Sequence, residues 1–593
     1  MIKDSNKYYI RILLCLILVQ CIYAAVIFAT QKQGFHSDEL WNYGFANSSS
    51  GTHVFKEDVG NIPKNADSWQ SVQLLRDYIT VDKSEIFAYV PIYWNAEHDY
   101  NPPLGYMLLH FICSFFPGSW SKWYNFMLNI ICFVISQIYL YKLVSGINKS
   151  PEVGIYACLF YGFTMAAVNV NIFLRIYAPA VMFGVMLMYY AAELYNKRGE
   201  KQNQWKLLLK LFIVNFAGCF TLHLFLPFAF IITAMYCLYY LFTKRFGYMV
   251  KYGLVMSASV ALSFAAFPAT VKHVFGDNDV YSTMSYMTRR FPPLMQYKMY
   301  WMYITNDLFG VHFSMWETMT MTYIGVALLL AAFILIPVCF LLRNEDKFKN
   351  FVKRAAAGTW KFLKKIKNFQ YTLAVLVAAA IFVIIIAARS TSVYGMGRYS
   401  TRYIFMLYPL LAAFAASIAG FILGWIFKKA LVRNIISAVL CVVFAVMSMA
   451  MSPKDYYFIH NEDGKTLTQL EENANCIIVT HEPWLLTCLT CEIFNTNNYF
   501  LANYDTALTD EYKSDKINSD DPLYLILDET HMDGNDRKFE ILGAAVEDVR
   551  QYTKDYKSSD YIEHFKNIDI ATKMEYAGTD AIFGRELKIY RLN

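Results

Sequence analysis

The sequence predicts a polytopic α-helical membrane protein with a small extracytoplasmic α/β domain at its C-terminal end. Of the 593 residues, 56% are hydrophobic and 17% are charged, and the mean hydropathy is +0.29. Soluble domains are less apolar and carry about 25% charge. Apolar runs of about 18 residues or more, the length that a membrane-spanning helix needs, recur from the N-terminus to residue 451. From residue 452 the composition changes to that of a soluble domain.

Lysine and arginine residues in short loops orient these runs, because such loops stay on the cytoplasmic side. Lys3, Lys7 and Arg11 place the N-terminus in the cytoplasm. The first run is too long for a signal peptide, and no clear cleavage site follows it, so we expect a retained helix. About eleven spans result, with the C-terminus outside. They cover residues 9–30, 123–144, 153–172, 176–195, 206–222, 224–243, 251–268, 320–342, 371–388, 403–426 and 433–451.

Two large segments are expected from this layout: a transmembrane module at 1–451 and a soluble outer domain at 452–593. The module carries two large outer loops, 31–122 and 269–319. The most basic segment, 343–367, falls inside, as the charge rule requires. The net charge of +6 sits mainly in short loops and therefore indicates no nucleic-acid partner.

The first outer loop contains two stretches with a predicted structure. An amphipathic helix is expected near 68–89. The stretch 104–116 is apolar for only about 13 residues, which favours an interfacial or re-entrant segment over a crossing. If 104–116 did cross, the later basic loops would fall outside, against the charge rule.

The soluble domain reads as a mixture of strands and helices. Buried strands are predicted at 476–480 and 523–528, and helices at 483–494 and 536–549. Residues 570–591 are expected to form two strands joined by a glycine-containing turn.

Cysteines are expected to play a packing role. Most of the 12 lie in apolar runs, where they act as small hydrophobes. Cys488 and Cys491 form a lone C-x-x-C motif. A packed helix with a disulfide to Cys476 is favoured over a metal site, because no second ligand pair is evident.

Notable polar residues near the predicted span ends all fall on the outer face. Asp38 and Glu39 follow the first span, and Asp99 precedes the second. Later outer positions supply arginine, tyrosine and histidine side chains. They are Arg175, Tyr177, His223, Arg289, Arg290, Arg398, Tyr399, Arg402 and Tyr403. Carboxylates beside arginines, whose planar fork binds phosphate bidentately, fit a reaction between an anionic lipid substrate and an outer-face nucleophile.

Each of these residues also has a purely structural interpretation. An Asp-Glu pair after a membrane helix is commonly a solvated loop or a helix N-cap. Arg175, Arg398 and Arg402 can extend to lipid headgroups. His223 can be an interfacial histidine, and part of the 17% aromatic content is an interface belt.

Five short motifs occur in the order found in one superfamily. They are His36-Ser37-Asp38-Glu39, Asp99-Tyr100-Asn101-Pro102-Pro103-Leu104-Gly105-Tyr106, Leu174-Arg175-Ile176-Tyr177-Ala178, Thr221-Leu222-His223 and Arg402-Tyr403-Ile404-Phe405-Met406-Leu407-Tyr408-Pro409. Their order, over about residues 1–430, resembles the GT-C superfamily of membrane glycosyltransferases. Within it the chain looks most like the protein O-mannosyltransferases and related bacterial polyprenyl-phosphate-sugar transferases.

The chain departs from the family pattern at three places. Asn101 replaces the histidine of the second motif, and Tyr106 stands where mannosyltransferases often carry lysine. The arginine usual at the start of the second span is absent from 122–125. These differences touch the expected donor-phosphate contacts, so the sugar and the acceptor stay open.

The resemblance implies an inverting glycosyltransferase that moves a sugar from a polyprenyl-phosphate donor to an extracytoplasmic hydroxyl on a glycan, lipid or protein. Polyprenyl phosphate is a good leaving group, whereas a hydroxyl is a poor nucleophile and needs a carboxylate base. Asp38 is expected to be that base, with Glu39 orienting it or binding the acceptor. The resemblance also implies a bacterial cell membrane, with the C-terminal domain outside.

Donor and acceptor contacts follow from the same resemblance. Arg398, Arg402 and Arg175 would neutralise the developing phosphate charge, and His223 is a further candidate for that task. The segment 104–116 would line the entry for the prenyl chain. The expected substrate-binding set is Asp99, Tyr106, Arg175, Tyr177, His223, Arg398, Arg402 and Tyr403. A divalent cation on Asp38, Glu39 and Asp99 stays an open alternative, and no metal ligand is assigned.

Two other classes of protein compete with this interpretation. A transporter or flippase of lipid-linked sugars would use the same arginines but need no base. Transporters often carry internal repeats and helices broken near mid-membrane, and the sequence indicates neither. A surface-anchored binding protein would leave the many spans unexplained.

Overall fold

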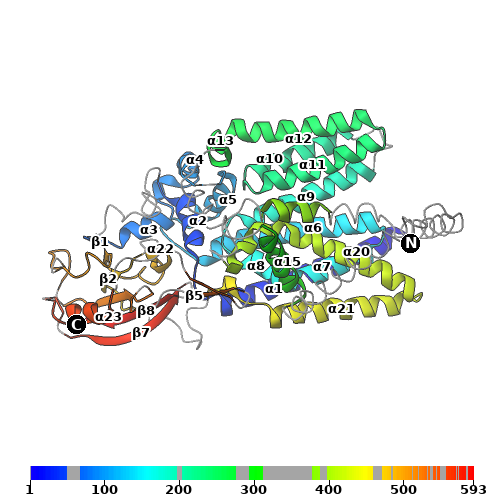
Figure 1. Ribbon diagram of the computed structural model, residues 1–593. Helices are drawn as coiled ribbons and strands as arrows, with labels where there is room; N and C mark the ends of the chain where they lie inside the picture. Colours follow the sequence, from blue (N-terminus) through cyan, green and yellow to red (C-terminus); the bar gives the residue numbers. More distant parts are fainter. Residues whose placement is uncertain are drawn as a thin grey trace, which may run out of the picture. The chain divides into compact units, whose positions relative to one another are not determined.

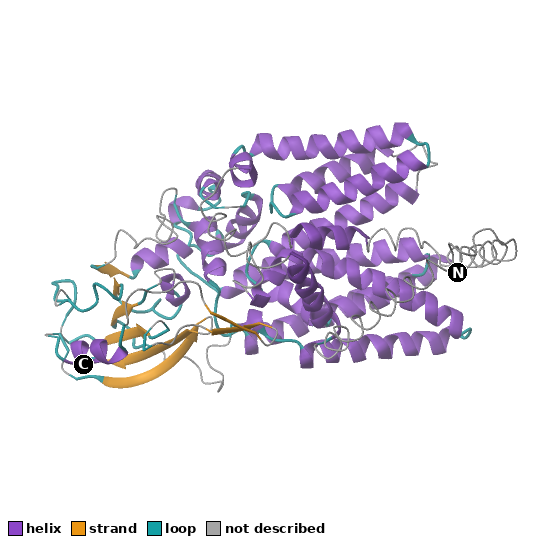
Figure 2. Ribbon diagram, in the orientation of Figure 1, coloured by secondary structure: helices purple, strands orange, loops and turns teal. Residues whose placement is uncertain are grey.

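The computed structural model is mostly helical, with its strands gathered in one part of the molecule (Figure 2). It describes residues 2–49, 67–99, 101–196, 204–275, 293–310, 377–386, 397–458, 470–481, 485–509, 512–518, 520–530, 532–533, 538–541, 544–547, 556–568, 570–571, 573–582 and 585–593. Four sequence predictions lie outside these residues: the span at 320–342, the basic segment at 343–367, and Arg289 and Arg290.

The chain divides into two compact units, which are described separately here. Unit 1 comprises Met1–Ala25, Asn129–Asn171 and Tyr177–Pro453. Unit 2 comprises Val26–Leu128, Ile172–Ile176 and Lys454–Asn593. Unit 2 therefore combines residues 26–128, which include the predicted first outer loop, with one short segment from the helical region and the C-terminal domain.

Unit 1 holds most of the long apolar helices (Figure 1). Its helices, three of which extend into unit 2, are α1 (Ile2–Gln31), α6 (Lys122–Asn148), α7 (Pro151–Gly162), α8 (Met165–Ile172), α9 (Tyr177–Asn196), α10 (Gln204–Cys219), α11 (Phe225–Phe242), α12 (Phe246–Ala266), α13 (Ala269–Phe275), α15 (Pro293–Phe309), Val377–Ile386, η2 (Gly397–Leu407), α20 (Tyr408–Ile426) and α21 (Ala430–Met451). Seven of the described helices are long and apolar enough to cross a membrane, or eight if α7 and α8 form one bent span. The chain is a multi-pass membrane protein.

Large apolar side chains on the outermost helices of unit 1 are exposed. Leu254 on α12 is 65% exposed and Leu431 on α21 is 72% exposed. Water does not favour an apolar surface of this extent, whereas lipid does. These faces are therefore the ones expected against the bilayer.

The predicted span at 153–172 is broken, because α7 and α8 meet at 63°. The expectation of an unbroken helix there is wrong. At the break, the Thr164 N–H and hydroxyl both donate to the Tyr161 carbonyl, at 3.1 and 2.7 Å. The Thr164 carbonyl then accepts from the Ala167 N–H and starts α8. A Cβ at Gly162 would overlap the Gln20 amide, so only glycine allows the close helix contact there.

The described residues of 31–122, the predicted first outer loop, form several short elements rather than one amphipathic helix near 68–89. They are α2 (Ser37–Asn47), β1 (Trp69–Ser71), α3 (Gln73–Ile79), η1 (Lys83–Glu85), α4 (Tyr89–Glu97) and α5 (Leu104–Cys113). Helix α3 ends at an extended Thr80, and the Asp82 carboxylate then caps η1 by accepting from the Ser84 N–H at 2.7 Å. Helix α5 has 10 residues, too few to cross a bilayer. Phe111 on α5 is exposed beside Phe87 and Phe115.

The C-terminal domain is built on a six-stranded sheet with the order β1-β3-β2-β4-β8-β7. The further strands are β2 (Asn475–Val479), β3 (Asn498–Ala502), β4 (Leu523–Asp528), β7 (Glu575–Ile582) and β8 (Arg585–Arg591). Strands β3, β2 and β4 run parallel, and the other neighbours are antiparallel. The predicted strands at 476–480 and 523–528 and the pair within 570–591 are confirmed. Strand β1, from the first outer loop, was not predicted.

Apolar side chains alternate between the two faces of this sheet. Ile477 and Leu525 lie in a cluster with helix α23 (Ser558–Lys566) on one face. Ile478 and Ile526 lie in a second cluster, with helices α22 (Leu485–Leu489) and α3, on the other. The domain is therefore an α/β layer structure with helices on both faces.

Two predictions for this domain are wrong and one is only partly right. Within the predicted helix at 536–549, the described residues form strands β5 (Lys538–Ile541) and β6 (Ala544–Glu547). The predicted helix at 483–494 is reduced to the five residues of α22. Cys476, Cys488 and Cys491 are free thiols, so the expected disulfide is absent. Cys476 and Cys488 pack in the apolar cluster around α22, and burial raises the pKa of the Cys476 thiol to about 12.

Candidate functional site

The first acidic motif forms the N-terminus of α2. The His36 Nδ1 accepts from the Asp38 N–H at 3.0 Å, and the Glu39 carboxylate accepts from the His36 N–H at 2.8 Å. This reciprocal pair is a capping box, which satisfies two backbone donors that the first helical turn leaves open. Both carboxylates lie in the first turn, where the helix dipole favours negative charge.

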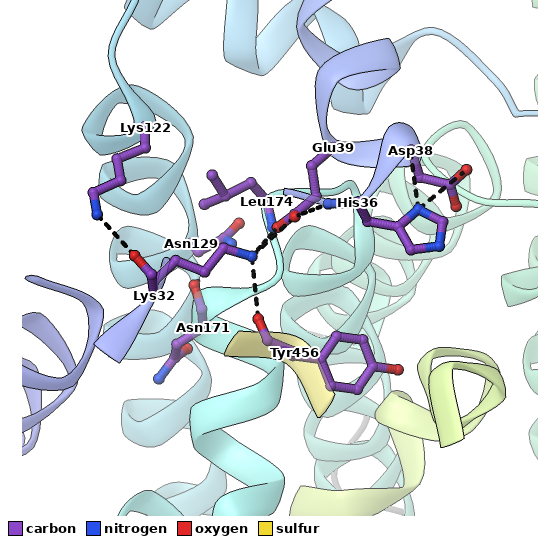
Figure 3. A network of polar contacts seen from close by, with 9 residues as sticks. All are labelled: Lys32, His36, Asp38, Glu39, Lys122, Asn129, Asn171, Leu174 and Tyr456. Atoms are coloured by element: carbon purple, nitrogen blue, oxygen red, sulfur yellow. Dashed lines mark hydrogen bonds and ion pairs between the residues drawn. The ribbon is translucent and has the colours of Figure 1, made fainter. Parts of the chain in front are cut away.

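Glu39 belongs to a buried ion pair that the sequence did not reveal. The Lys32 Nζ donates to both Glu39 carboxylate oxygens, at 2.7 and 2.9 Å, and to the Tyr456 carbonyl at 3.1 Å (Figure 3). Both side chains of the pair are 0% exposed. Burial lowers the pKa of the Lys32 ammonium to about 8, against the opposing effect of Glu39. Burial likewise raises the pKa of the Glu39 carboxyl, against Lys32 and the two backbone N–H donors.

The two neighbouring carboxylates therefore have different environments. Glu39 is enclosed and accepts hydrogen bonds from Lys32, His36 and Leu174. The Asp38 side chain is 14% exposed and points away from that ion pair (Figure 3). Its Oδ1 lies 3.8 Å from the His36 Nδ1. Asp38 is thus the carboxylate of the motif that an outside molecule can reach, and Glu39 holds the motif in place.

A pH-dependent stability is expected from Lys32. The unfolded chain keeps the Lys32 proton up to the ordinary pKa of 10.5, whereas the folded chain releases it near pH 8. Between these values the unfolded state binds more protons, so the contribution of Lys32 to the free energy of unfolding rises with pH. The measurement is the midpoint temperature of thermal unfolding in detergent. The midpoint of wild type minus that of Lys32→Met should increase as the pH is raised from 8 to 10.5. A flat or falling difference contradicts this prediction.

The second acidic motif is held by Tyr106 and Arg175. The Asp99 Oδ2 accepts from the Tyr106 hydroxyl on α5, and from the Asn101 amide at 3.2 Å. The Arg175 guanidinium lies 3.8 Å from the same oxygen, with both side chains 7% exposed. The departure from the family motif at Tyr106 and Asn101 thus supplies two direct contacts to Asp99.

One short segment contacts both acidic motifs. Residues 172–176 belong to unit 2, although the chain on either side lies in unit 1. The Leu174 N–H donates to the Glu39 Oε1 at 2.8 Å (Figure 3). Arg175 pairs with Asp99, and the Phe173 ring packs against the His36 ring with centroids 6.1 Å apart. Five predicted site residues, Asp38, Glu39, Asp99, Tyr106 and Arg175, therefore lie in unit 2, where residues 172–176 link the two acidic motifs.

The other predicted site residues lie in unit 1. Tyr177 begins α9, and its ring packs against Phe405 of η2, 5.8 Å between centroids. Arg402 is buried, and its guanidinium donates to the Tyr403 hydroxyl at 3.3 Å. Arg398 lies at the start of η2. His223, between α10 and α11, has its Nε2 3.4 Å from the Nδ1 of His273 on α13.

Asp307 is a buried carboxylate of unit 1 that the sequence analysis missed. It lies near the end of α15 and is 0% exposed. The Tyr408 hydroxyl donates to the Asp307 Oδ2 at 2.5 Å. Tyr408 directly follows η2, the segment that carries Arg402. The Asp307 carbonyl accepts from the Ser448 hydroxyl of α21 at 2.7 Å. The signal available in the sequence was a lone carboxylate in the stretch 293–309, which also holds Gln296, Lys298 and Asn306.

Tyr408→Phe is expected to destabilise unit 1 by about 1–3 kcal/mol, because the buried Asp307 carboxylate loses a donor that water cannot replace. The measurement is thermal unfolding of the detergent-solubilised protein. Tyr8→Phe is the control, since Tyr8 is exposed. Equal midpoints for Tyr408→Phe and Tyr8→Phe would contradict the prediction.

The residues proposed for a divalent cation do not fit one. Glu39 already accepts from Lys32 and two backbone N–H groups, and Asp99 faces Arg175. Among the residues that the structure describes, no group of three or more His, Cys, Asp or Glu side chains is placed to hold a metal ion. No chemical step is therefore assigned to a metal.

No protein-family model and no curated protein matches the chain. Among solved structures, it is similar to the Archaeoglobus fulgidus oligosaccharyltransferase tethered with an acceptor peptide, at 12% identity and a TM-score of 0.41, over 87% of this chain and 69% of that one. It is also similar to ArnT from Cupriavidus metallidurans bound to undecaprenyl phosphate, at 10% identity and a TM-score of 0.40, over 100% and 99%. At these values neither likeness assigns an activity or a substrate to this chain.

Proposed function

We propose that this chain is an integral-membrane inverting glycosyltransferase of the GT-C type. It moves one sugar from a polyprenyl phosphate to a hydroxyl of an extracytoplasmic glycan, lipid or protein. The order of its five motifs and its apolar helices support this proposal. The protein acts in the bacterial cell membrane, with the N-terminus in the cytoplasm and the C-terminal domain outside.

The observation that carries the proposal is the double contact made by residues 172–176. This segment bonds to Glu39 through the Leu174 N–H and pairs with Asp99 through Arg175. Glu39 and Leu174 are 135 positions apart in the chain. A solvated loop or a lone helix cap would not need a buried arginine and two acidic motifs at one place, whereas a site for a charged reaction would.

Asp38 acts as the general base. Its carboxylate takes the proton from the acceptor hydroxyl while the hydroxyl oxygen attacks the anomeric carbon in line with the leaving phosphate. The bond from the anomeric carbon to the phosphate oxygen breaks, so the configuration at that carbon inverts. Glu39 and Lys32 position the turn that carries Asp38. Arg175 and Asp99 bind substrate groups in this proposal, and without substrate they pair with each other.

For the predicted residues of unit 1, we propose roles that rest on the resemblance. Arg398 and Arg402 neutralise the charge that develops on the departing polyprenyl phosphate, because a guanidinium stays charged and donates bidentately. His223 assists them, and Tyr177 and Tyr403 contact the donor. The exposed aromatic side chains of the segment 104–116, Phe111, Phe115 and Phe116, line the entry of the prenyl chain.

The test uses the purified full chain in proteoliposomes. Undecaprenyl-phosphate mannose, glucose and galactose, each radiolabelled in the sugar, are supplied with an envelope fraction from a strain that lacks the gene. Transfer of label to the acceptor, with inversion of the anomer seen by NMR, supports the proposal. Movement of intact donor across the bilayer without transfer from any of the three would replace it with a flippase.

A further inference from the structure

The three parallel strands of the C-terminal sheet, β2, β3 and β4, end at the same edge. After β2 the chain passes over one face of the sheet, and after β4 it passes over the other. Strand β2 leads to α22, whose Leu485 packs in the cluster that contains Ile478. Its neighbour β4 leads to Met532 and then α23, which pack in the cluster on the other face. In open α/β sheets, ligands bind in a crevice outside the carboxyl ends of adjacent strands whose connections part in this way, and such a crevice is expected at the ends of β2 and β4.

Side chains from all three strand ends form a bonded base for this crevice. Asp528, at the end of β4, is 0% exposed. Its Oδ2 accepts from the hydroxyl of Thr480, which follows β2, at 2.8 Å. Its carbonyl accepts from the hydroxyl of Tyr504, which follows β3. Thr530 donates to the Asp528 Oδ1 from both its N–H and its hydroxyl, at 3.1 and 2.5 Å. The three strand ends are thereby fixed relative to one another.

Aromatic rings and a carboxylate stand beside this base. The His481 ring centroid lies 5.6 Å from that of Tyr504 and 6.3 Å from that of Tyr556. The Tyr556 hydroxyl donates to the Asp505 Oδ1 at 3.2 Å. His481 and Tyr556 are partly exposed and Asp505 is exposed, so a molecule in solution can reach all three.

A second carboxylate follows β4 directly. Glu529 pairs with Lys588 of β8, the Oε2 lying 2.5 Å from the Nζ. Its other oxygen, Oε1, is buried and accepts no hydrogen bond from the part of the chain that the structure describes. A buried acceptor of this kind is normally satisfied by a donor, and a ligand hydroxyl can supply one.

We propose that the crevice at the carboxyl ends of β2, β3 and β4 binds a saccharide, with Tyr556 and His481 against the sugar ring and Asp505 and Glu529 accepting from its hydroxyls. Sugars present an apolar face of C–H groups and a rim of hydroxyl donors, which match an aromatic surface beside carboxylates. The identification of this saccharide as part of the acceptor rests on the proposed function. Saccharide binding at this place does not depend on that function.

A phosphate-bearing ligand such as a nucleotide fits the same place poorly. Phosphate sites after a parallel strand use a glycine-rich turn and a helix N-terminus. Here the chain after β2 reads His481-Glu482-Pro483-Trp484, without glycine and with an acidic residue. The carboxylates of Asp505 and Glu529 would also repel phosphate.

Saturation-transfer NMR on the full chain in nanodiscs tests the proposal, with chitobiose, mannobiose and cellobiose as probes. Wild type is expected to transfer saturation to the ring protons of at least one of them. Tyr556→Ala should raise the Kd about tenfold, the effect of losing one stacking contact. Asp505→Asn should weaken binding in the same direction. The matched controls are Tyr576→Ala, an exposed tyrosine of β7, and Asp515→Asn, an exposed aspartate; both should bind as wild type does.

Transfer to none of the three disaccharides by wild type, or equal loss in Tyr556→Ala and Tyr576→Ala, overturns the proposal. His481→Ala gives a second readout if Tyr556→Ala does not fold. Asp38→Asn keeps the saccharide contact while losing turnover, because Asp38 takes no part in the crevice. If wild type binds a saccharide but transfers no sugar, the crevice is a saccharide-binding site and does not bind the acceptor of a transfer reaction.

Discussion

Replacing Asp38 by asparagine is expected to lower kcat about 10²–10⁴-fold, the usual contribution of a general base. Asparagine keeps the size and the backbone contacts of the first α2 turn but cannot take a proton. KM should change little, because Glu39 and Lys32 still hold the turn. Turnover is measured as transfer of radiolabel from the polyprenyl-phosphate donor that wild type uses. Wild type is expected to lose kcat at low pH, as the base becomes protonated, and this loss should be absent in the variant.

Asp82→Asn is the matched control for this substitution. Asp82 lies in the same outer loop, is exposed, and caps η1 by accepting from Ser84. Asparagine caps a helix about as well as aspartate does, so this variant should keep full turnover. An Asp38→Asn enzyme within about threefold of wild type would remove the base assignment, since base catalysis contributes far more.

Breaking the Lys32–Glu39 pair is expected to have the largest effect on stability. Lys32→Met leaves the Glu39 carboxylate buried without its ammonium, and a buried charge that loses its partner costs about 3–5 kcal/mol. The double variant Lys32→Met/Glu39→Gln should be more stable than Lys32→Met alone, because a neutral amide costs less to bury and can still accept from the His36 or Leu174 N–H. Unfolding by heat and by SDS titration in detergent gives the order of the variants.

The exposed pair Lys573–Glu575, 3.2 Å apart, serves as the control. Ion pairs of this kind contribute little, because water and salt screen them. Lys573→Met should therefore unfold like wild type. If Lys32→Met also unfolds like wild type, or if the double variant is the least stable of the set, then the pair does not hold the α2 turn.

The membrane helices could be predicted from the sequence because a bilayer demands long apolar runs and leaves few alternatives. Helices α6, α9, α11, α12 and α21 lie where hydropathy places them. The break between α7 and α8 was missed, since it depends on hydroxyl and backbone bonds that hydropathy does not register. In the C-terminal domain, residues 536–549 were predicted to be a helix, because a short apolar run carries no clear period. The described residues of this stretch form strands because β5 and β6 pair with each other in an antiparallel arrangement.

By itself, the sequence determined that the chain crosses a membrane repeatedly and that carboxylates follow the first crossing. Only the tertiary structure decided which carboxylate is reachable. Asp38 and Glu39 are adjacent, but successive residues of a helix point in directions about 100° apart, so one meets Lys32 and Leu174 while the other does not. Likewise, Arg175 meets Asp99 only because residues 172–176 fold with the outer loop. These contacts join residues distant in the chain, and no local pattern encodes them.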